Sequence, residues 1–365
     1  MGPEGALRVG LWVDGGRVAR VQVSSSRPDI ARELLSGRSR AETVAMVPRL
    51  YSICARSQAA ASELACAAAA GEPVDADLLA RSREAVSAET LRELALRTLL
   101  EWPKTLGETP DEATIAAARG ALSAPVGGSG SAIARAAFGS PAEEWLALQT
   151  LPALQHWADQ GHTAAARFVR RVLDDDATAG DAPPAAAVAA VPLLPAPLPW
   201  PALAALAMAA AGDAEFSRHP VWRGAPAETG ALARQQSNAL LRALMQRGNS
   251  RIAARVVARL RELALLLAGR GGSALGATAL PDGGGLAWVE NARGLLLHRL
   301  RLVQGRTADY RIVAPTEWNF HPAGALPAAL CDSPAHDLDA LRRRTRVLVD
   351  SLDPCVACSV EIEDA

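Results

Sequence analysis

Residues 351–365 read SLDPCVACSVEIEDA and place two cysteines, Cys355 and Cys358, directly behind an Asp-Pro pair. A cysteine thiolate is both a nucleophile and a soft metal ligand, so the pair can be a redox dithiol or part of a metal site. The thioredoxin-like interpretation lacks its usual strand-then-helix context early in a βαβ unit. A zinc site needs four ligands, and the sequence contains no second Cys-x-x-Cys. The pair therefore needs partners from elsewhere in the chain.

The other three cysteines differ in how well they suit such a partnership. Cys66 falls inside an alanine-rich helical pattern and Cys331 in a polar loop, and we interpret each as an inert small residue. Cys54 lies in the stretch VPRLYSICARSQAAAS. The pattern from Ser57 to Gly71 predicts a helix with a serine start and a glycine stop, which places Cys54 in or near the turn before it. Cys54 is therefore the best candidate partner.

The composition is that of a globular protein without a strong overall charge. Half of the 365 residues are apolar, which is enough to bury the core of one large domain or of two ordinary ones. The formal net charge of -1 argues against a general attraction to nucleic acid or to an anionic membrane. Five cysteines, an odd number in so long a chain, favour reduced thiols in a cytoplasm over a disulfide framework.

Two further patterns bear on localisation. The start MGPEGALRVGLWVDGG has neither the basic leader nor the apolar region of a signal peptide. The longest apolar stretch is interrupted by prolines at 192, 195, 197, 199 and 201, which would break a spanning helix repeatedly. We therefore expect a cytoplasmic protein without a membrane span.

The order of patterns along the chain predicts an α+β protein, mainly helical, with small sheet regions near both termini. Apolar residues alternate from Leu7 to Val13 and precede an Asp-Gly-Gly turn, which indicates a hairpin. Residues 75–170 show several helical segments, and the last hundred residues combine strand-like runs with a helix before the cysteine pair. We expect one domain over 1–365, with a Pro/Ala-rich flexible segment at about 174–201.

Five segments, in order along the chain, resemble the large subunit of nickel-iron hydrogenases. The stretch around Cys54 is similar to that family's amino-terminal metal motif, and DPCVAC is similar to its carboxyl-terminal motif. The other three segments are PAETGALAR at 226–234, ENARGLLLH at 290–298 and YRIVAPTEWN at 310–319. The resemblance reaches from the first metal motif to the last residues, with nothing placed in 75–210. It implies the large-subunit fold.

The resemblance also implies which residues hold metal. In the family, the second cysteine of each motif bridges nickel and iron, and the first binds nickel alone. Cys54 and Cys358 match the bridging thiolates, and Cys355 matches a nickel-only ligand. Tyr51 stands where the family has the other nickel-only cysteine, and a phenol with a pKa of about 10 is a poor substitute. The resemblance thus implies an iron site at Cys54, Cys358 and Cys355, and it argues against nickel.

The family's iron also carries two cyanides and a carbon monoxide, and the cyanides need hydrogen-bond donors. Arg293 matches an arginine that overhangs the metal, and Thr316, which follows Pro315, matches a hydroxyl that bonds a cyanide. A guanidinium suits this role because it presents several donors and keeps its charge. Without the resemblance, Arg293 would be interpreted as a surface ion pair with Glu290, and Thr316 as a turn residue.

Further departures from the family pattern bear on catalysis. Arg32 stands where the family has its proton-relay glutamate, although Glu33 is only one residue away. Gln58 stands where the family usually has a histidine, and Glu361 follows Cys358 where the family has a histidine before a tail that is cleaved. Together with the loss of a nickel ligand, these changes do not suit a working hydrogenase. The pattern resembles the HupK/HoxV type of hydrogenase maturation protein.

Three hypotheses follow from this resemblance. The first is a non-catalytic scaffold that binds the iron with its cyanides and carbon monoxide and transfers it to a hydrogenase. The second is a metal-free mimic of the large subunit that acts as an interaction protein for maturation chaperones. The third, a divergent catalyst, is weakest because of Tyr51. The implied partners are a HypC/HypD-like chaperone complex, which supplies the iron, and a large-subunit precursor, which receives it.

Overall fold

The structure is a computed structural model that describes residues 5–27, 30–123, 126, 130–178, 188, 190–213, 215–247 and 251–364, with only the backbone at 176–178, 200 and 364. The chain divides into two compact units. The first comprises Met1–Val86, Val191–Arg234 and Ser273–Ala365, and the second comprises Ser87–Ala190 and Gln235–Gly272. All the residues that the sequence analysis assigned to the metal site belong to the first unit. One domain over 1–365 stays a prediction.

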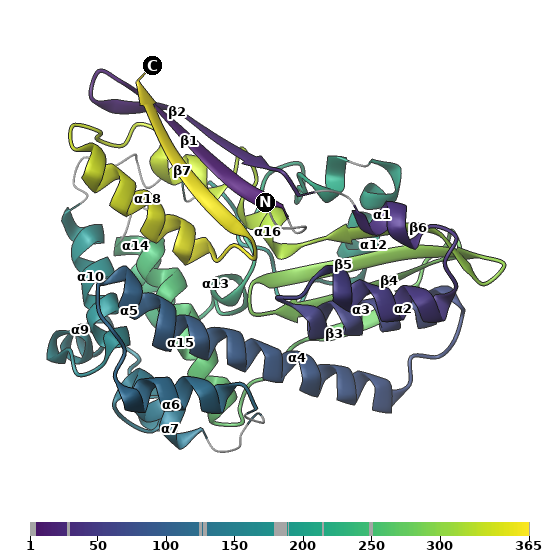
Figure 1. Ribbon diagram of the computed structural model, residues 1–365, viewed down its shortest axis with the longest axis horizontal. Coiled ribbons are helices and arrows are strands. Elements are labelled where there is room, and N and C mark those ends of the chain that lie inside the picture. The colour runs from purple at the N-terminus through teal and green to yellow at the C-terminus, as the bar shows by residue number, and fades with distance from the viewer. Residues whose placement is uncertain are drawn as a thin grey trace. The chain divides into compact units, whose positions relative to one another are not determined.

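The predicted amino-terminal hairpin is present in the first unit (Figure 1). It consists of β1 (Ala6–Asp14) and β2 (Arg17–Ser25), which pair in antiparallel fashion. Gly15 and Gly16 form the turn with φ of 55° and 76°. Glycine adopts this left-handed conformation without steric cost, so the Asp-Gly-Gly sequence fixes where the chain reverses.

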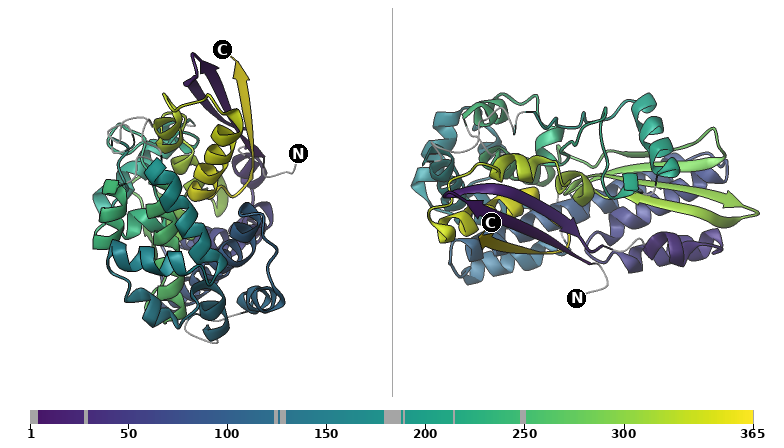
Figure 2. Two further views of the ribbon diagram at one scale, coloured as in Figure 1. Left: turned by 90° about the vertical axis from the view of Figure 1, so that its left-hand side faces the viewer. Right: turned by 90° about the horizontal axis from the view of Figure 1, so that it is seen from above.

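The carboxyl-terminal strand joins the same sheet on the other side of β1. This strand, β7 (Ala357–Asp364), pairs with β1 in parallel, and the register places Cys358 opposite Leu7. Alternation along β1 buries Leu7 and Leu11 on the core side. Helix α18 (Leu338–Leu352) precedes β7 and contacts it, as the views in Figure 2 show. The predicted participation of both chain ends in sheet structure is confirmed.

A second sheet of the first unit is an antiparallel meander. Its strands, in spatial order, are β3 (Leu275–Ala279), β4 (Gly284–Asn291), β5 (Gly294–Val303) and β6 (Arg306–Val313). Helix α3 (Ala55–Ala69) packs on this sheet. Gly285 permits the close approach, because a Cβ at this position would collide with the backbone oxygen of Ala65 in α3. The meander and α3 thus share one core.

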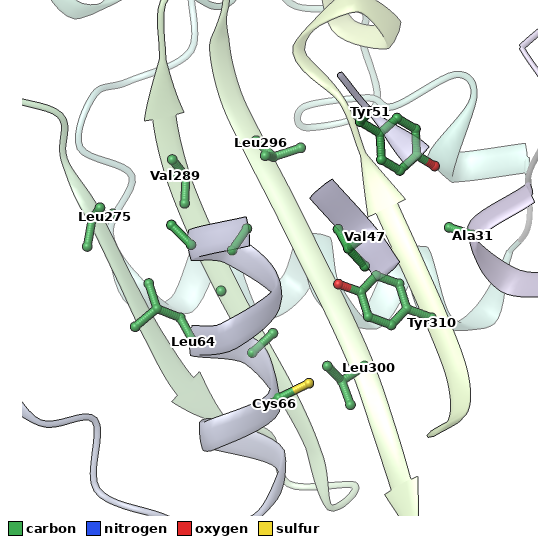
Figure 3. Packing of buried hydrophobic residues seen from close by; sticks show 14 of the residues in the cluster. Ala31, Val47, Tyr51, Leu64, Cys66, Leu275, Val289, Leu296, Leu300 and Tyr310 are labelled. Atoms are coloured by element: carbon green, nitrogen blue, oxygen red, sulfur yellow. The ribbon is translucent and has the colours of Figure 1, made fainter. Parts of the chain in front are cut away.

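Cys66 belongs to this core, as Figure 3 shows. It is completely buried, points toward Leu300 of the sheet, and belongs to the same cluster as Leu64 and Val289. Burial raises the pKa of the Cys66 thiol to about 11, so the group stays protonated at neutral pH. This environment agrees with the interpretation of Cys66 as an inert core residue.

The turn before α3 carries the first metal motif. Helix α2 (Arg40–Leu50) ends directly before Tyr51, and Cys54 is the residue that precedes α3. The placement of Cys54 before a helix is confirmed. The predicted helix start at Ser57 is wrong by two residues, because the Gln58 N–H already donates to the Cys54 carbonyl oxygen at 3.0 Å. Ser57 is buried inside the helix and does not serve as its cap.

The remaining short and medium helices of the first unit connect these elements. They are α1 (Ile30–Leu35), α12 (Trp200–Gly212), the 3₁₀ turn η2 (Glu215–Ser217), α13 (Ala231–Arg234), α16 (Pro315–Asn319) and α17 (Ala325–Leu330). Helix α16 begins with Pro315, whose fixed φ suits the first turn of a helix. It follows β6 after a single residue, which fixes the position of Thr316 and Glu317 relative to the meander.

The second unit is helical in its described residues, as the sequence patterns predict for 75–170. Helix α4 (Ala76–Leu96) leads into it, and the elements that follow are η1 (Arg97–Glu101), α5 (Trp102–Thr105), α6 (Glu112–Ala121), α7 (Ser131–Phe138), α8 (Ala142–Leu146), α9 (Leu151–Gln160), α10 (Ala164–Thr178), α14 (Ala239–Arg247) and α15 (Ile252–Leu267). Within the residues that the structure describes, none of the helices has both the length and the apolar character needed to cross a membrane. Residues 179–187 and 189 of the predicted flexible segment lie outside the described residues.

Candidate metal centre

Three parts of the first unit place side chains around one buried cysteine, Cys355. The loop after β2 contributes Arg27, helix α16 contributes Thr316 and Glu317, and Cys355 itself follows α18. The Thr316 Oγ1 lies 3.1 Å from the Cys355 Sγ, and the Arg27 Nη1 donates to the same sulfur at 3.5 Å. The Cys355 sulfur thus has a hydroxyl group and a charged guanidinium donor beside it.

Cys54 receives comparable support from helix α3. Its position directly before the helix places it near the backbone N–H groups of the first turn, where the helix dipole favours negative charge. The Gln58 Nε2, one turn into the helix, donates to the Cys54 Sγ at 3.6 Å. Cys54 is 9% exposed, so this sulfur is shielded from bulk water.

The Gln58 amide is in turn oriented by a buried histidine and a buried tyrosine. The Gln58 Oε1 lies 2.9 Å from the His298 Nε2, and the Tyr310 hydroxyl lies 2.7 Å from the His298 Nδ1. Burial lowers the pKa of His298 to about 3, so the ring is neutral at physiological pH. A neutral ring carries one proton, and the amide oxygen can only accept. The His298 Nε2–H therefore donates to Gln58, and the Tyr310 hydroxyl donates to Nδ1.

This arrangement makes a chain of hydrogen bonds that all point the same way. Each donor along Tyr310, His298 and Gln58 directs its hydrogen toward the next residue, and the last one meets the Cys54 sulfur. Bonds aligned in this manner polarise one another. The chain fixes the Gln58 side chain with its amide nitrogen toward Cys54, and it leaves the sulfur as an acceptor.

Arg27 connects the two motifs electrostatically. Its guanidinium lies 5.2 Å from the centre of the Tyr51 ring, and its Nη1 lies 3.7 Å from the Glu317 Oε1. The Arg27 and Glu317 side chains are 12% and 11% exposed. Burial alone would lower the pKa of Arg27, but electrostatic interactions with Cys355, Glu317, Tyr51 and Cys54 outweigh it and raise the pKa. Arg27 is a permanent cation beside both cysteines.

Arg293 lies in a buried environment that the sequence without the resemblance did not predict. It is 7% exposed, and its Nε lies 3.8 Å from the Asp353 Oδ2. The interpretation as a surface ion pair is therefore wrong. Glu290 is also buried and forms an ion pair with Arg234 at 2.7 Å. Asp353 is an ion-pair partner of Arg293 and lies two residues before Cys355. This ion pair connects the arginine to the second cysteine motif.

The backbone around Arg293 is held by two asparagines. The Asn291 Oδ1 accepts from the Arg293 N–H at 3.0 Å, and the Asn319 Nδ2 donates to the Arg293 carbonyl oxygen at 3.2 Å. Gly294, with φ of 130°, follows directly and packs against Thr229, where a side chain would collide. The segments around 229, 291 and 319 belong to three of the blocks that resemble the hydrogenase family. The structure brings these blocks together at one place.

Thr316 and Pro315 occupy the first turn of α16 and are both buried. The Thr316 hydroxyl contacts a cysteine sulfur, so the interpretation of Thr316 as a mere turn residue is wrong. Its role as a cyanide donor stays a prediction. Pro315 lacks a backbone N–H and contributes a rigid apolar wall next to that hydroxyl.

Cys358 lies in a different environment from Cys54 and Cys355. It belongs to the edge strand β7, its side chain is partly exposed, and its thiol contacts the Ser359 carbonyl oxygen at 3.8 Å. Burial, and to a smaller extent the charge of Asp350 in α18, raises the pKa of Cys358 to about 11. Among the described residues there is no cluster of three or more His, Cys, Asp or Glu side chains placed to hold a metal ion. The assignment of all three cysteines as ligands stays a prediction.

A cavity of about 370 Å³ adjoins the centre. Arg27, Tyr51 and Glu317 line it, and so do Arg218 and His219. Neither Cys54 nor Cys355 is among its described lining residues. Arg27 both lines the cavity and contacts the Cys355 sulfur.

Arg27 and Asp353 are the residues that the sequence analysis did not select. Arg27 follows the serines at the end of β2 and belongs to no recognisable motif, so its partners at Cys355 and Glu317, hundreds of positions away, left no local signal. Asp353 was visible as the first residue of DPCVAC, but only the fold shows that it reaches Arg293. Arg32 and Glu33, which bear on proton transfer, are exposed on α1, and Arg32 lies 3.9 Å from Asp309.

Comparison with known proteins identifies the family. A model of nickel-dependent hydrogenases matches residues 273–361. The hydrogenase expression/formation protein HoxV of Cupriavidus necator is 35% identical over 94% of this chain and 93% of its own length. The chain belongs to the HoxV/HupK family. HupK of Rhizobium leguminosarum bv. viciae, another hydrogenase expression/formation protein, is 30% identical over 99% of this chain and 97% of its own length.

Solved structures confirm the fold of this HoxV/HupK chain. The Ni-Fe-Se hydrogenase of Desulfovibrio vulgaris Hildenborough superposes with a TM-score of 0.57 at 16% identity and covers 94% of both chains. The corresponding enzyme of Desulfomicrobium baculatum gives a TM-score of 0.54. At this identity the likeness shows the fold alone. The prediction of a large-subunit-like fold, mainly helical with small sheets, is confirmed.

Proposed function

We propose that this protein is a non-catalytic scaffold in hydrogenase maturation, which binds iron with its cyanide and carbon monoxide ligands and transfers it to a hydrogenase large-subunit precursor. Relatives of similar length are named hydrogenase expression/formation proteins, which supports a role in maturation. The observation that carries the finer proposal is that Cys54 and Cys355, one from each of the two cysteine motifs, are both buried and both interact electrostatically with Arg27. The resemblance to the large subunit supports it, because it implies that Tyr51 stands in place of a cysteine.

The side chains of the centre suit such a cargo chemically. Two thiolates are soft ligands for iron, and they release a metal more readily than a set of four because fewer bonds must break. Thr316, beside Cys355, and Arg293, behind it through Asp353, supply hydrogen-bond donors for anionic ligands. Cys358 would complete the predicted ligand set from the neighbouring strand. The walls around the site are buried, which keeps water from the iron.

The same residues argue against a hydrogenase activity. Tyr51 takes the place of a nickel ligand, and a phenol is neutral at physiological pH and a harder donor than a thiolate. The resemblance places Arg32 of α1 at the position of the proton-relay glutamate, with Glu33 one residue away as the alternative, and an arginine there carries the opposite charge and cannot accept a proton. We therefore propose that the protein handles the iron fragment without turning over hydrogen.

The proposed partners follow from this role. A HypC/HypD-like chaperone complex in the cytoplasm would supply the iron fragment, and a large-subunit precursor would accept it. The shared fold offers a reason for recognition, because a protein shaped like the large subunit can present the same surface to the supplying complex as the final acceptor does.

An infrared spectrum with metal counting tests the proposal. The protein is purified without oxygen from a host that expresses the maturation proteins, and iron and nickel are measured on the same sample. Cyanide and carbon monoxide stretching bands with iron, and without nickel, are the expected result. The test needs a control chain from a host without maturation proteins, which should carry iron without these bands or no iron.

The main alternative is a metal-free mimic of the large subunit. The partly exposed position of Cys358, and the cation of Arg27 beside the other two cysteines, are the observations that favour it. A blank infrared spectrum without stoichiometric iron, combined with stable binding to the maturation chaperones, would establish this alternative and reject the scaffold. Hydrogen turnover by a nickel-loaded sample would reject both.

A further inference from the structure

Arg27 has a position that goes beyond the support of a thiolate. Its Nη1 lies 3.5 Å from the Cys355 sulfur and 3.7 Å from the Glu317 carboxylate, so a single guanidinium nitrogen contacts both groups. The same guanidinium lies over the ring of Tyr51, where cation–π attraction holds it. The space in front of Cys355 is therefore filled by a cation.

The charge of this group cannot be removed by a change of pH. A guanidinium stays protonated in proteins at all ordinary pH values. A metal ion that approached Cys355 from the cavity would meet this fixed positive charge in surroundings that screen it little. Arg27 lines the cavity together with Tyr51 and Glu317 and also contacts the Cys355 sulfur.

Tyr51 contributes to this arrangement through the same substitution that removed a ligand. A cysteine at position 51 would offer a thiolate and no aromatic face. The tyrosine ring instead offers a surface on which the guanidinium rests, 5.2 Å from its centre. The loss of one metal ligand and the placement of a cation are thus two effects of one residue.

We propose that Arg27 is a specificity-determining residue that closes the position beside Cys355 to a second metal ion and restricts the centre to one metal. This inference rests on the proposed function, in which that one metal is the iron of the transferred fragment. The chemistry that is excluded is the binding of a soft divalent cation such as nickel, cobalt or zinc by Cys355 together with Cys54 and Glu317. Charge repulsion and occupied space act together in the exclusion.

Titration of the metal-free full-length protein with Co²⁺ tests this inference, because Co²⁺ bound by thiolates gives a characteristic charge-transfer absorption. The wild-type chain should bind at most one Co²⁺ per chain, in the position proposed for iron. Arg27→Gln, which keeps hydrogen-bonding capacity but removes the charge, should bind a second Co²⁺ per chain, at least about tenfold tighter than the wild type binds a second ion. The additional absorption should disappear again in Arg27→Gln/Cys355→Ala.

Two matched variants separate charge from structure. Arg27→Lys retains the cation and, like the wild type, should bind no second Co²⁺. Arg299→Gln removes another buried arginine, one that pairs with Asp282 and Asp309 on the meander, and should leave Co²⁺ binding unchanged. Circular dichroism checks that each variant folds. If Arg27→Gln does not fold because Glu317 is left without its cation, Arg27→Gln/Glu317→Gln removes both charges and takes its place.

The outcomes distinguish this inference from the proposed function. If neither neutral variant gains Co²⁺, or if Arg27→Lys gains as much as Arg27→Gln, Arg27 does not exclude a second metal. That result leaves the infrared bands of the iron-loaded wild type, and hence the scaffold, unaffected. If the neutral variants gain Co²⁺ but the wild type never shows the infrared bands, Arg27 excludes a second metal ion and the proposed scaffold function is rejected.

Discussion

The two cysteines of one short motif, Cys355 and Cys358, lie in opposite environments. Cys355 is buried next to a hydroxyl and a guanidinium, whereas Cys358 lies on an edge strand with its thiol near a carbonyl oxygen and a carboxylate. The second environment raises the pKa of its thiol, whereas the first brings a cationic N–H donor to its sulfur. Spacing in a motif therefore does not decide what each cysteine can do; the donors that the fold brings to each sulfur decide it.

The largest predicted effect is the loss of iron when a ligand cysteine is replaced. Cys54→Ala, Cys355→Ala and Cys358→Ala should each be measured for iron and for the infrared bands in the matured protein. The predicted ligand set requires that Cys54→Ala and Cys358→Ala abolish binding. Cys66→Ala is the matched control, since Cys66 is buried in the α3 core with its thiol protonated, and it should retain the iron.

A Cys358→Ala variant that keeps its iron would show that Cys54 and Cys355 suffice, and that the partly exposed thiol is not a ligand. An equal loss from Cys66→Ala would instead show that the assay reports folding rather than ligation. Cys331→Ala, which alters a partly exposed cysteine after α17, should also leave iron binding intact.

The next prediction concerns His298, whose hydrogen bond orients the Gln58 amide beside Cys54. The unfolded chain protonates this histidine near pH 6.5, but burial lowers the pKa of the folded form to about 3. Unfolding therefore takes up a proton between these values, and the free energy of unfolding should fall as the pH drops from about 6.5 to about 3. The gap corresponds to roughly 4–5 kcal/mol.

Urea unfolding of the wild type and of His298→Gln between pH 7 and pH 4 measures this contribution. The variant should lose stability at pH 7, because Tyr310 and Gln58 lose a matched partner, but its stability should depend less on pH. His156→Gln changes an exposed histidine of the second unit and should keep the wild-type dependence. Parallel pH curves for the wild type and His298→Gln would contradict the assignment of a neutral, buried imidazole.

The smallest effect concerns the reactivity of Cys358. Its pKa of about 11 leaves little thiolate at neutral pH, so alkylation by iodoacetamide should be slow there and should speed up about tenfold for each pH unit toward pH 10. Asp350→Asn removes the neighbouring charge and should increase the rate several-fold at a fixed pH, because less repulsion opposes the thiolate. Peptide mass spectrometry follows Cys358 separately from the buried cysteines.

Asp339→Asn, an exposed change near the other end of α18, is the control for this last prediction and should leave the rate as it is. If Cys358 reacted at pH 7 as fast as a small-molecule thiol, its pKa would not be raised. The proposed difference between the environments of Cys355 and Cys358 would then be wrong.

The sequence predicted the elements that depend on neighbours in the chain. The hairpin of β1 and β2 followed from alternation and a Gly-Gly turn, and the helix after Cys54 followed from its alanine-rich pattern and glycine stop. Its exact start was missed, because the first helical hydrogen bond depends on backbone geometry at Cys54 and not on a capping side chain. The resemblance of five short segments was sufficient to recognise the fold.

Contacts between residues that are far apart in the chain could not be predicted from the sequence. Nothing near Arg27 indicated that its guanidinium would lie between Tyr51, Glu317 and Cys355, because these partners come from three other elements. The burial of Arg293 was missed for the same reason, since its partner Asp353 belongs to another motif. Local patterns determine elements, whereas a centre assembled from several loops requires their arrangement in space.

The parallel pairing of β7 with β1 has a consequence for protein synthesis. Of the described strands, a ribosome makes β1 first and β7 last, and the sheet requires both. Cys355 is joined to β7 through a single residue, so it reaches its place beside Arg27 only as that last strand docks. A nascent chain that exposes Cys54 before residues 355–364 have been made lacks Cys355, and under the proposed function it cannot take up the iron until β7 has been synthesised.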